Sequence, residues 1–243
     1  MHYEQTITRA RVGFIIPTSN RLVEPQMQKY MPNGVVPHFT RIGMTDAHKR
    51  PLDQLLPRIL DAASMLAEAK CDVTALQCTG TSMSGGVGSE HRVIREIEAK
   101  TGRHAISAAS AVSAALQAFG ARKIVFISEA DEHLHDEKLR FLVEMGFDVL
   151  ADKAAGLSGS DEWCAMPPKY WFDQAIALRT DAAEAYFISC ANIQSIDALA
   201  DLEAELGRPV VTSNQASLWL ALRKAGIADA IPALGKLLGR EAH

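Results

Sequence analysis

The chain has 243 residues, of which 48% are hydrophobic and 22% charged, with a formal net charge of −4. This composition is typical of a globular protein with a large core, in one large domain or two of ordinary size. It disfavours nucleic-acid binding, since no Lys/Arg run is interleaved with aromatics, and no apolar run reaches the roughly 18 residues of a membrane span. The polar start lacks a secretory pattern and the four cysteines are scattered, so we expect a cytoplasmic protein with free thiols.

The first part of the chain predicts strands that alternate with helices. The helix at 52–70 has the clearest signal, because its apolar residues recur with the 3.6-residue period. The strands are continuous apolar runs, which suit parallel strands covered on both faces. The predicted strands are 11–16, 35–42, 72–77 and 104–107, and the predicted helices are 52–70, 89–101 and 108–119.

The second part repeats this alternation. It predicts strands at 123–128, 147–150, 185–189 and 209–212, and helices at 131–145, 170–178, 196–206 and 215–225. Residues 152–170 contain two glycines and two prolines and are interpreted mostly as loop. Strands alternating with helices indicate an α/β fold with parallel, right-handedly connected sheets.

The alternation contains an internal repeat. Phe14 lies 64 positions before Cys78, and Phe126 lies 64 positions before Cys190. The run 102–107 (GRHAIS) resembles 207–212 (GRPVVT), and the Thr-Ser-Asn of 18–20 recurs at 212–214. We interpret this as a tandem duplication that gives two pseudo-twofold-related parallel-sheet α/β halves. The expected first half is 1–107 plus 214–243, the second is 108–213, and a cleft between them holds the active site.

Each half delivers one cysteine from a strand end. Cys78 follows the strand at 72–77, Cys190 follows the strand at 185–189, and ligands in parallel α/β sheets sit beyond such ends. Two opposed thiols need no metal and no cofactor: a thiolate takes a proton or adds to carbon, and a thiol returns a proton. One thiol pKa must then fall below its ordinary value of roughly 8.5. A single cysteine in this place is typically a small core residue, and Cys71 and Cys164 have no repeat partner.

Small and polar residues surround the two cysteines. Their side chains and backbone amides are suited to hold a carboxylate or a developing enolate oxygen. We therefore expect a small carboxylate as the partner of this site. The predicted substrate-binding residues are Asn20, Thr79, Gly80, Thr81, Ser128, Ala191, Asn192, Ser213 and Asn214.

Two other patterns carry weaker signals. The glycines at 85, 86 and 88 resemble a phosphate loop, but they lack the Lys-Ser/Thr of a P-loop, so a turn into a helix is the better interpretation. His133 and His135 suggest a metal, but no further ligand cluster completes the set. We interpret them as the solvated first turn of a helix.

The motifs resemble a known family. The run 11–20 (RVGFIIPTSN), then Glu24-Pro25, is similar to the opening of maleate cis–trans isomerases, in the aspartate/glutamate racemase superfamily beside arylmalonate decarboxylases and hydantoin racemases. The loops at 78–82 (CTGTS) and 189–190 (SC) match in order. The runs 189–192 (SCAN) and 206–216 (LGRPVVTSNQA) resemble the ectoine-utilisation branch.

The resemblance implies roles for three residues. Cys78 would be the nucleophile or first base, Cys190 the second acid/base, and Asn20 a carboxylate ligand. The decarboxylases keep only the cysteine at the Cys190 position, so the presence of both favours isomerisation or racemisation.

The chain departs from the isomerase pattern in two places. The isomerases carry Thr-Pro-Tyr where this chain has 128–130 (SEA), so Ala130 replaces a carboxylate-binding Tyr. An Asn of the long second-half loop is also missing, with Ser160 or Asp161 in its place. Because a dianion near Glu129 and Asp131 would be repelled unless those side chains face away, we expect a larger or less charged substrate than maleate.

The leading hypothesis is a cofactor-independent two-cysteine isomerase or racemase of a small carboxylate. One alternative is a decarboxylase of a substituted malonate that uses Cys190 alone and tolerates Cys78→Gly. Another is a non-catalytic small-acid binding protein. The apolar residues at 170–172 and 219–222 leave room for an interface, and we expect a homodimer or higher homo-oligomer.

Overall fold

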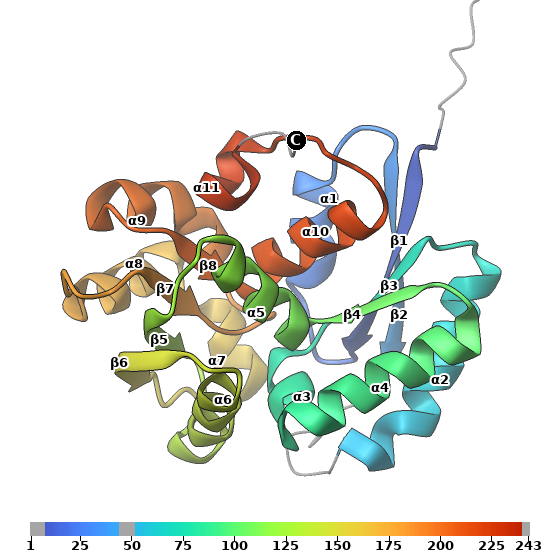
Figure 1. Ribbon diagram of the computed structural model, residues 1–243, viewed down its shortest axis with the longest axis horizontal. Coiled ribbons are helices and arrows are strands. Elements are labelled where there is room, and N and C mark those ends of the chain that lie inside the picture. Colours follow the sequence, from blue (N-terminus) through green and yellow to red (C-terminus); the bar gives the residue numbers. More distant parts are fainter. Residues whose placement is uncertain (1–7, 44–51, 240–243) are drawn as a thin grey trace, which may run out of the picture.

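Two four-stranded parallel sheets form the framework of the protein, as the computed structural model in Figure 1 shows. The structure describes residues 8–43 and 52–239. The first sheet has the order β2-β1-β3-β4, and its strands are β1 (Ala10–Pro17), β2 (Val35–Ile42), β3 (Val73–Leu76) and β4 (His104–Ser107). The second has the order β6-β5-β7-β8, with β5 (Lys123–Ser128), β6 (Asp148–Ala154), β7 (Ala185–Ile188) and β8 (Val210–Thr212).

The internal repeat predicted from the sequence is visible in the strand register. Phe14 of β1 pairs with Ala75 of β3, and Phe126 of β5 pairs with Phe187 of β7, at the same sequence separation. The strand order of the second sheet is that of the first, shifted by four strands. The predicted α/β class with two parallel sheets is therefore confirmed.

Helices cover both faces of each sheet, which explains why the strands are apolar throughout. In the first sheet, α2 (Leu52–Glu68) packs on β1, β2 and β3, and α4 (Gly86–Thr101) packs on β4. In the second sheet, α6 (Glu132–Glu144) packs on β6, α8 (Pro168–Ala177) on β7 and α9 (Leu199–Leu206) on β8. The remaining short helices are α1 (Val23–Tyr30), α3 (Thr79–Met83), α7 (Gly159–Ala165), η2 (Ser195–Ala198), η3 (Pro232–Leu234) and α11 (Gly235–Leu238).

Two helices join the sheets at the centre of Figure 1. Helix α5 (Ala108–Ala118) leaves β4 and contacts β8, whereas α10 (Ser213–Lys224) leaves β8 and contacts β3 and β4. Both helices begin with a reciprocal capping box, in which Ser107 pairs with Ser110 and Thr212 pairs with Gln215. The repeated GR…S/T runs therefore end in the caps of two helices that pack against each other.

One hydrophobic core contains residues from both sheets. Val12 and Phe14 of β1 belong to the same buried cluster as Val125 and Ile127 of β5, together with Leu218 of α10. A smaller cluster lies beneath α2 and α4, and another lies between α5 and α6. The shared core fixes the strand ends of the two sheets relative to each other, and this positions the cysteines that follow them.

The structure differs from the sequence prediction mainly in short helices. Helix α1 was not predicted, because only Val23, Gln26 and Met27 are buried in it and they form no clear apolar stripe. Helix α7 lies in the segment predicted as loop and has no buried residue. Helix α3 and the extension of β6 to Ala154 were also missed. The glycines at 85 and 86 do form a turn into α4, with positive φ at both, as predicted.

The described residues include no helix that is both long enough and apolar enough to cross a membrane.

We predict that Gly13→Ala destabilises the fold. A Cβ at Gly13 would lie 2.9 Å from Leu66 Cδ1 and 3.1 Å from Leu66 Cβ, inside a buried part of β1. Overpacking of this kind costs about 1–3 kcal/mol, which urea denaturation would measure as a lower free energy of unfolding. Gly88→Ala is the matched control: a Cβ there meets nothing within 4 Å in α4, so it should be neutral or slightly stabilising. Equal stability of the two variants would contradict the prediction.

Candidate active site

Cys78 lies where β3 ends and α3 begins. It has an extended backbone and is the N-cap residue of α3. Its thiol donates to the Thr81 hydroxyl oxygen at 3.1 Å, and Thr81 is one of the predicted binding residues. The residue is partly buried and packs against the cluster beneath α2 and α4. A short turn of small residues thus presents this sulfur at the carboxyl end of β3.

Cys190 occupies the equivalent place after β7. Its side chain is buried, and the Asn192 backbone N–H donates to its sulfur at 3.3 Å. The Ser189 N–H continues the sheet ladder by donating to Ile127 of β5. Cys190 is therefore the second residue beyond the strand, in a loop whose Asn192 amide donates a hydrogen bond to its sulfur.

The pKa values of both thiols lie above the ordinary cysteine value. Burial raises the pKa of Cys78, and the hydroxyl and backbone amide of Thr81 offset part of that rise. Burial raises the pKa of Cys190 well above its ordinary value, and the negative charge of Glu129 adds to the rise. Neither thiol therefore has the lowered pKa that the sequence led us to expect, because loss of solvation outweighs the nearby donors. Cys78 is the thiol that is easier to ionise.

The two cysteines share one electrostatic environment. A charge on Cys78 raises the pKa of Cys190, and both thiols respond to the charges of Glu129 and Lys138. Geometry also links their loops: Asn214 accepts a hydrogen bond from Gln77, which precedes Cys78, and donates one to the carbonyl of Ala191, which follows Cys190. The two cysteines therefore lie on strand-end loops that one buried side chain joins.

A network of buried amides fixes the loop after Cys190. The Ala191 carbonyl accepts hydrogen bonds from Asn20 Nδ2 and from Asn214 Nδ2, both at 3.1 Å. Asn214 also donates to Gln26 and accepts from Gln77 Nε2 at 2.8 Å. The network therefore joins residues that follow β1, β3, β7 and β8, and it brings together three of the predicted binding residues.

Asn20 and Asn214 make different sets of hydrogen bonds within this network. Both side-chain groups of Asn214 are engaged with other residues of the protein, so its role here is to support the loop. Asn20 Oδ1 accepts from the backbone amides of Leu22 and Val23 at the start of α1, and its Nδ2 contacts Ala191. Asn192 Oδ1 accepts from the Arg21 backbone N–H at 2.9 Å, so the loops after β1 and β7 are also tied together directly.

Several buried polar atoms near the strand ends have no hydrogen-bond partner among the described residues. They share a position in the loops that follow β3, β7 and β8, where buried polar groups normally have partners. These atoms are Gln77 Oε1, Thr79 Oγ1, Ser189 Oγ, Asn192 Nδ2 and Ser213 Oγ. Their chemistry, with hydroxyl and amide donors beside two thiols, suits a small polar ligand.

Ser128 is held by a neighbouring helix. Its hydroxyl lies 2.7 Å from His135 Nδ1, and His135 Nε2 lies 2.9 Å from Asp152 Oδ1. His135 is buried and stacks on Phe126, whereas the His133 side chain is 81% exposed. The prediction of a solvated first turn holds for His133 and is wrong for His135, because α6 turns that side chain toward β5. Ser128 lies at the predicted strand end, but its hydroxyl is committed to this histidine.

The two acidic residues that follow β5 have different environments. Both oxygens of Glu129 lie 2.7 Å from Lys138 Nζ, and both side chains are buried. Asp131 is exposed and caps α6 by accepting from the Leu134 N–H. The expected repulsion of a dianionic substrate is therefore removed at Glu129, which is paired with a lysine.

Sequence reasoning missed Lys138 as a site residue. A signal was present, since Leu134, Lys138, Phe141 and Leu142 form the buried stripe of α6, and a lysine within an apolar stripe requires a buried partner. Two predicted positions contribute no side-chain polar group: Gly80 lies in α3 against Leu134 and Lys138, and Ala191 is buried and bonds through its backbone carbonyl. Among the residues that the structure describes, no cluster of His, Cys, Asp or Glu could hold a metal ion.

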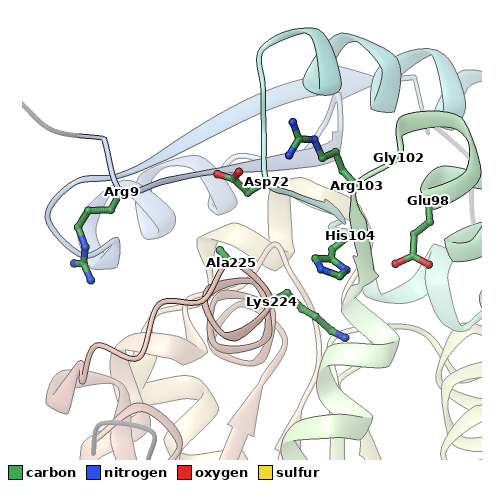
Figure 2. Close-up of a pocket in the computed structure, with 8 residues that line it drawn as sticks. All are labelled: Arg9, Asp72, Glu98, Gly102, Arg103, His104, Lys224 and Ala225. Atoms are coloured by element: carbon green, nitrogen blue, oxygen red, sulfur yellow. The ribbon is translucent and has the colours of Figure 1, made fainter.

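A large open pocket lies at the amino ends of the strands of the first sheet, whereas the cysteines follow the carboxyl ends. Figure 2 shows His104 and Lys224 facing each other across it, while Arg9 points away. The pocket has a volume of about 520 Å³ and is bordered by residues just before β1, before β3 and at the start of β4. The two carboxylates of this pocket already accept hydrogen bonds from the backbone: Asp72 from the Arg11 N–H and Glu98 from the Ala105 N–H. It contains neither thiol and is separate from the candidate active site.

Comparison with known proteins finds maleate isomerases and an arylmalonate decarboxylase that are similar to this chain. The maleate isomerase of Pseudomonas putida is 24% identical over 94% of this chain and 96% of its own. The arylmalonate decarboxylase of Bordetella bronchiseptica is 23% identical over 96% of this chain and 98% of its own. A Nocardia farcinica maleate cis–trans isomerase, solved as a mutant with a covalently bound succinylcysteine intermediate, superposes with a TM-score of 0.87 at 21% identity, over 96% of this chain and 99% of that structure.

The match to the family is continuous along the chain. Residues 12–238, from the first strand through the last helix, match the family model described as arylmalonate decarboxylase. The relatives named above are isomerases and a decarboxylase, with the same two-sheet fold. This chain belongs to the arylmalonate decarboxylase family.

Proposed function

We propose that the protein is a cofactor-independent cysteine enzyme that isomerises or racemises a small carboxylate. The observation that carries this proposal is that Cys78 and Cys190 follow repeat-related strand ends, and that one buried side chain, Asn214, bonds to the residue before Cys78 and to the residue after Cys190. A single cysteine would suffice for protonation alone. Two thiols in one site allow one to act as base or nucleophile while the other acts as acid.

With an unsaturated acid as substrate, the two thiols would act one after the other. The Cys78 thiolate adds to one alkene carbon, a C–S bond forms, and the resulting carbanion takes the proton of the Cys190 thiol. After rotation about the new single bond, the Cys190 thiolate removes that proton and the C–S bond breaks. For a racemisation, Cys78 removes the proton from Cα and Cys190 delivers one to the opposite face. The covalent succinylcysteine in the Nocardia farcinica relative supports the first route for this chain.

The substrate that we propose is larger or less charged than maleate. By family resemblance, a carboxylate-binding Tyr is replaced by the buried Ala130, which has no donor. Asp161 stands near the place of a missing Asn and forms an ion pair with Arg21 instead. By the same resemblance Asn20 would be a carboxylate ligand: its Nδ2 donates one hydrogen bond to Ala191 beside Cys190, and we propose that its second N–H binds one carboxylate of the substrate.

A cofactor-free decarboxylation of a substituted malonate is the second candidate. The match to the decarboxylase family model and the Bordetella bronchiseptica relative favour it. In that reaction, Cys190 alone protonates the enediolate that remains after carbon dioxide leaves. The role of Cys78 separates the two candidates.

We predict that Cys78→Ala and Cys190→Ser each reduce isomerisation or racemisation by at least about a hundredfold, the scale of lost acid–base catalysis. Turnover would be followed by proton NMR in deuterated water, against a panel of unsaturated, α-substituted and malonic acids. Cys71→Ala and Cys164→Ser are the controls, since Cys71 is buried beneath α2 and Cys164 lies in α7 beside Arg21. Full turnover by both active-site variants would exclude the proposal.

Cys78→Gly tests the decarboxylase alternative. If carbon dioxide release from a substituted malonate persists in this variant and is lost in Cys190→Ser, the protein is a decarboxylase that does not need Cys78. If Cys78→Gly abolishes all turnover, the two-cysteine mechanism is supported.

The roles of Ser213 and Asn214 predict opposite phenotypes. Ser213→Ala removes a buried hydroxyl that has no partner in the described structure, so stability should be unchanged or slightly higher while KM rises. Asn214→Leu leaves the amides of Gln26 and Gln77 unpaired, at about 1–3 kcal/mol for each buried group. Thermal denaturation and steady-state kinetics measure both effects. A stable Asn214→Leu protein would contradict the supporting role of the network.

A further inference from the structure

The Glu129–Lys138 ion pair is fully buried beside the two thiols. The side chains are 2% and 0% exposed, whereas the Lys169–Asp173 pair of α8 is 78% and 53% exposed. Burying two charges costs solvation energy that their attraction does not reliably recover, so such a pair is weak evidence for stability. Its position relative to the cysteines indicates another role.

Lys138 lies on the Cys78 side of the pair. It belongs to the buried stripe of α6, and α6 packs against α3. A Cβ placed on Gly80, two residues after Cys78, would lie 3.9 Å from Lys138 Cε. The lysine side chain is therefore directly behind the turn that carries the Cys78 thiol, where its positive charge favours the thiolate and lowers the thiol pKa.

Glu129 is placed by the strand that neighbours β7. It is the first residue after β5, and the Ser189 N–H next to Cys190 donates to the Ile127 carbonyl of β5. After burial itself, the negative charge of Glu129 is the largest influence that raises the pKa of Cys190. For Cys78 the relative size of the two charge effects is reversed: Lys138 lowers the thiol pKa by more than Glu129 raises it. The pair is neutral overall, with Lys138 packed beside the α3 turn that follows Cys78 and Glu129 placed just beyond β5, the strand that pairs with β7.

Other titratable groups near the thiols are engaged elsewhere. From α6, His135 is held by Ser128 and Asp152, and Asp131 caps its own helix. From α4, Glu90 is buried and accepts a hydrogen bond from Ser107. The charges that act on both cysteines are those of Glu129 and Lys138, and the charge of Cys78 acts in addition on Cys190.

We propose that Glu129 and Lys138 are positioning residues that divide the roles of the two thiols, so that Cys78 is the first to lose its proton while Cys190 keeps its own. This inference rests on the proposed function of the two cysteines, and it names the device that divides their roles. A substrate between them would meet a nucleophile or base on the α3 side and an acid on the β7 side. Because the pair is neutral, it polarises the site without repelling an anionic substrate.

The test measures thiol ionisation without any substrate. The alkylation rates of Cys78 and Cys190 with iodoacetamide are followed separately by peptide mass spectrometry across a pH series, and each profile gives a midpoint. In the unmodified protein we expect the lower midpoint at Cys78. In the double variant Lys138→Met/Glu129→Leu, which leaves no unpaired buried charge, the Cys78 midpoint should rise and the Cys190 midpoint should fall. Unchanged midpoints would show that the pair is only structural.

Three further variants complete the design. Lys169→Met/Asp173→Leu removes an exposed pair of the same type and should leave both midpoints unchanged. Lys138→Arg keeps the charge and should keep the order of the midpoints. If the double variant fails to fold, the single variant Glu129→Gln tests the inference. Removing the negative charge of Glu129 must lower the midpoint of Cys190 alkylation. A constant midpoint in Glu129→Gln would overturn the inference.

The result is independent of the catalytic proposal. If Cys78→Ala retains turnover while the midpoints move as expected, the proposed function fails and the electrostatic role of the pair stands. If turnover needs both cysteines but the midpoints ignore the pair, the function stands and this inference fails.

Discussion

The hydrogen bonds to the Ala191 carbonyl are the constraint on which the site depends. One donor, Asn20, follows the first strand of the first sheet, and the other, Asn214, begins the helix that returns from the second sheet. The acceptor immediately follows Cys190. Since these amides are buried, breaking the contacts would leave unpaired polar groups in a region of low dielectric. The position of the Cys190 sulfur is therefore fixed by residues from both ends of the chain.

Burial sets the chemical problem of this site. It raises the pKa of both cysteines, which makes them poor nucleophiles at rest, while it also strengthens every nearby charge and hydrogen bond. The Thr81 hydroxyl, the Asn192 amide and the Glu129–Lys138 pair act on thiols that water does not screen. In the function proposed here, these groups replace the metal or cofactor that other enzymes use to stabilise an anion.

The polar residues around β5 show how the fold reassigns its side chains. Ser128, at the strand end where the sequence predicts a ligand contact, is bound by His135 of α6. The carboxylate of Glu129 is neutralised by Lys138, which lies about one helical turn after His135 in α6. Helix α6 therefore supplies both partners, and its packing against β6 and α3 determines what charge the site presents.

The sequence by itself determined the α/β class, the two parallel sheets and the duplicated strand ends with their cysteines. Apolar runs, the 64-residue spacing and the repeated capping sequences are local or periodic features that can be detected without coordinates. Only the tertiary structure decided that His135 is buried, that Lys138 reaches Glu129, and that Asn214 donates to the carbonyl of Ala191. Each of these depends on which face of a helix meets which strand, and the energy of burying a polar group is set by partners far away in the chain. The short helices α1 and α7 escaped detection for the related reason that they bury few or no side chains, so no periodic pattern marks them.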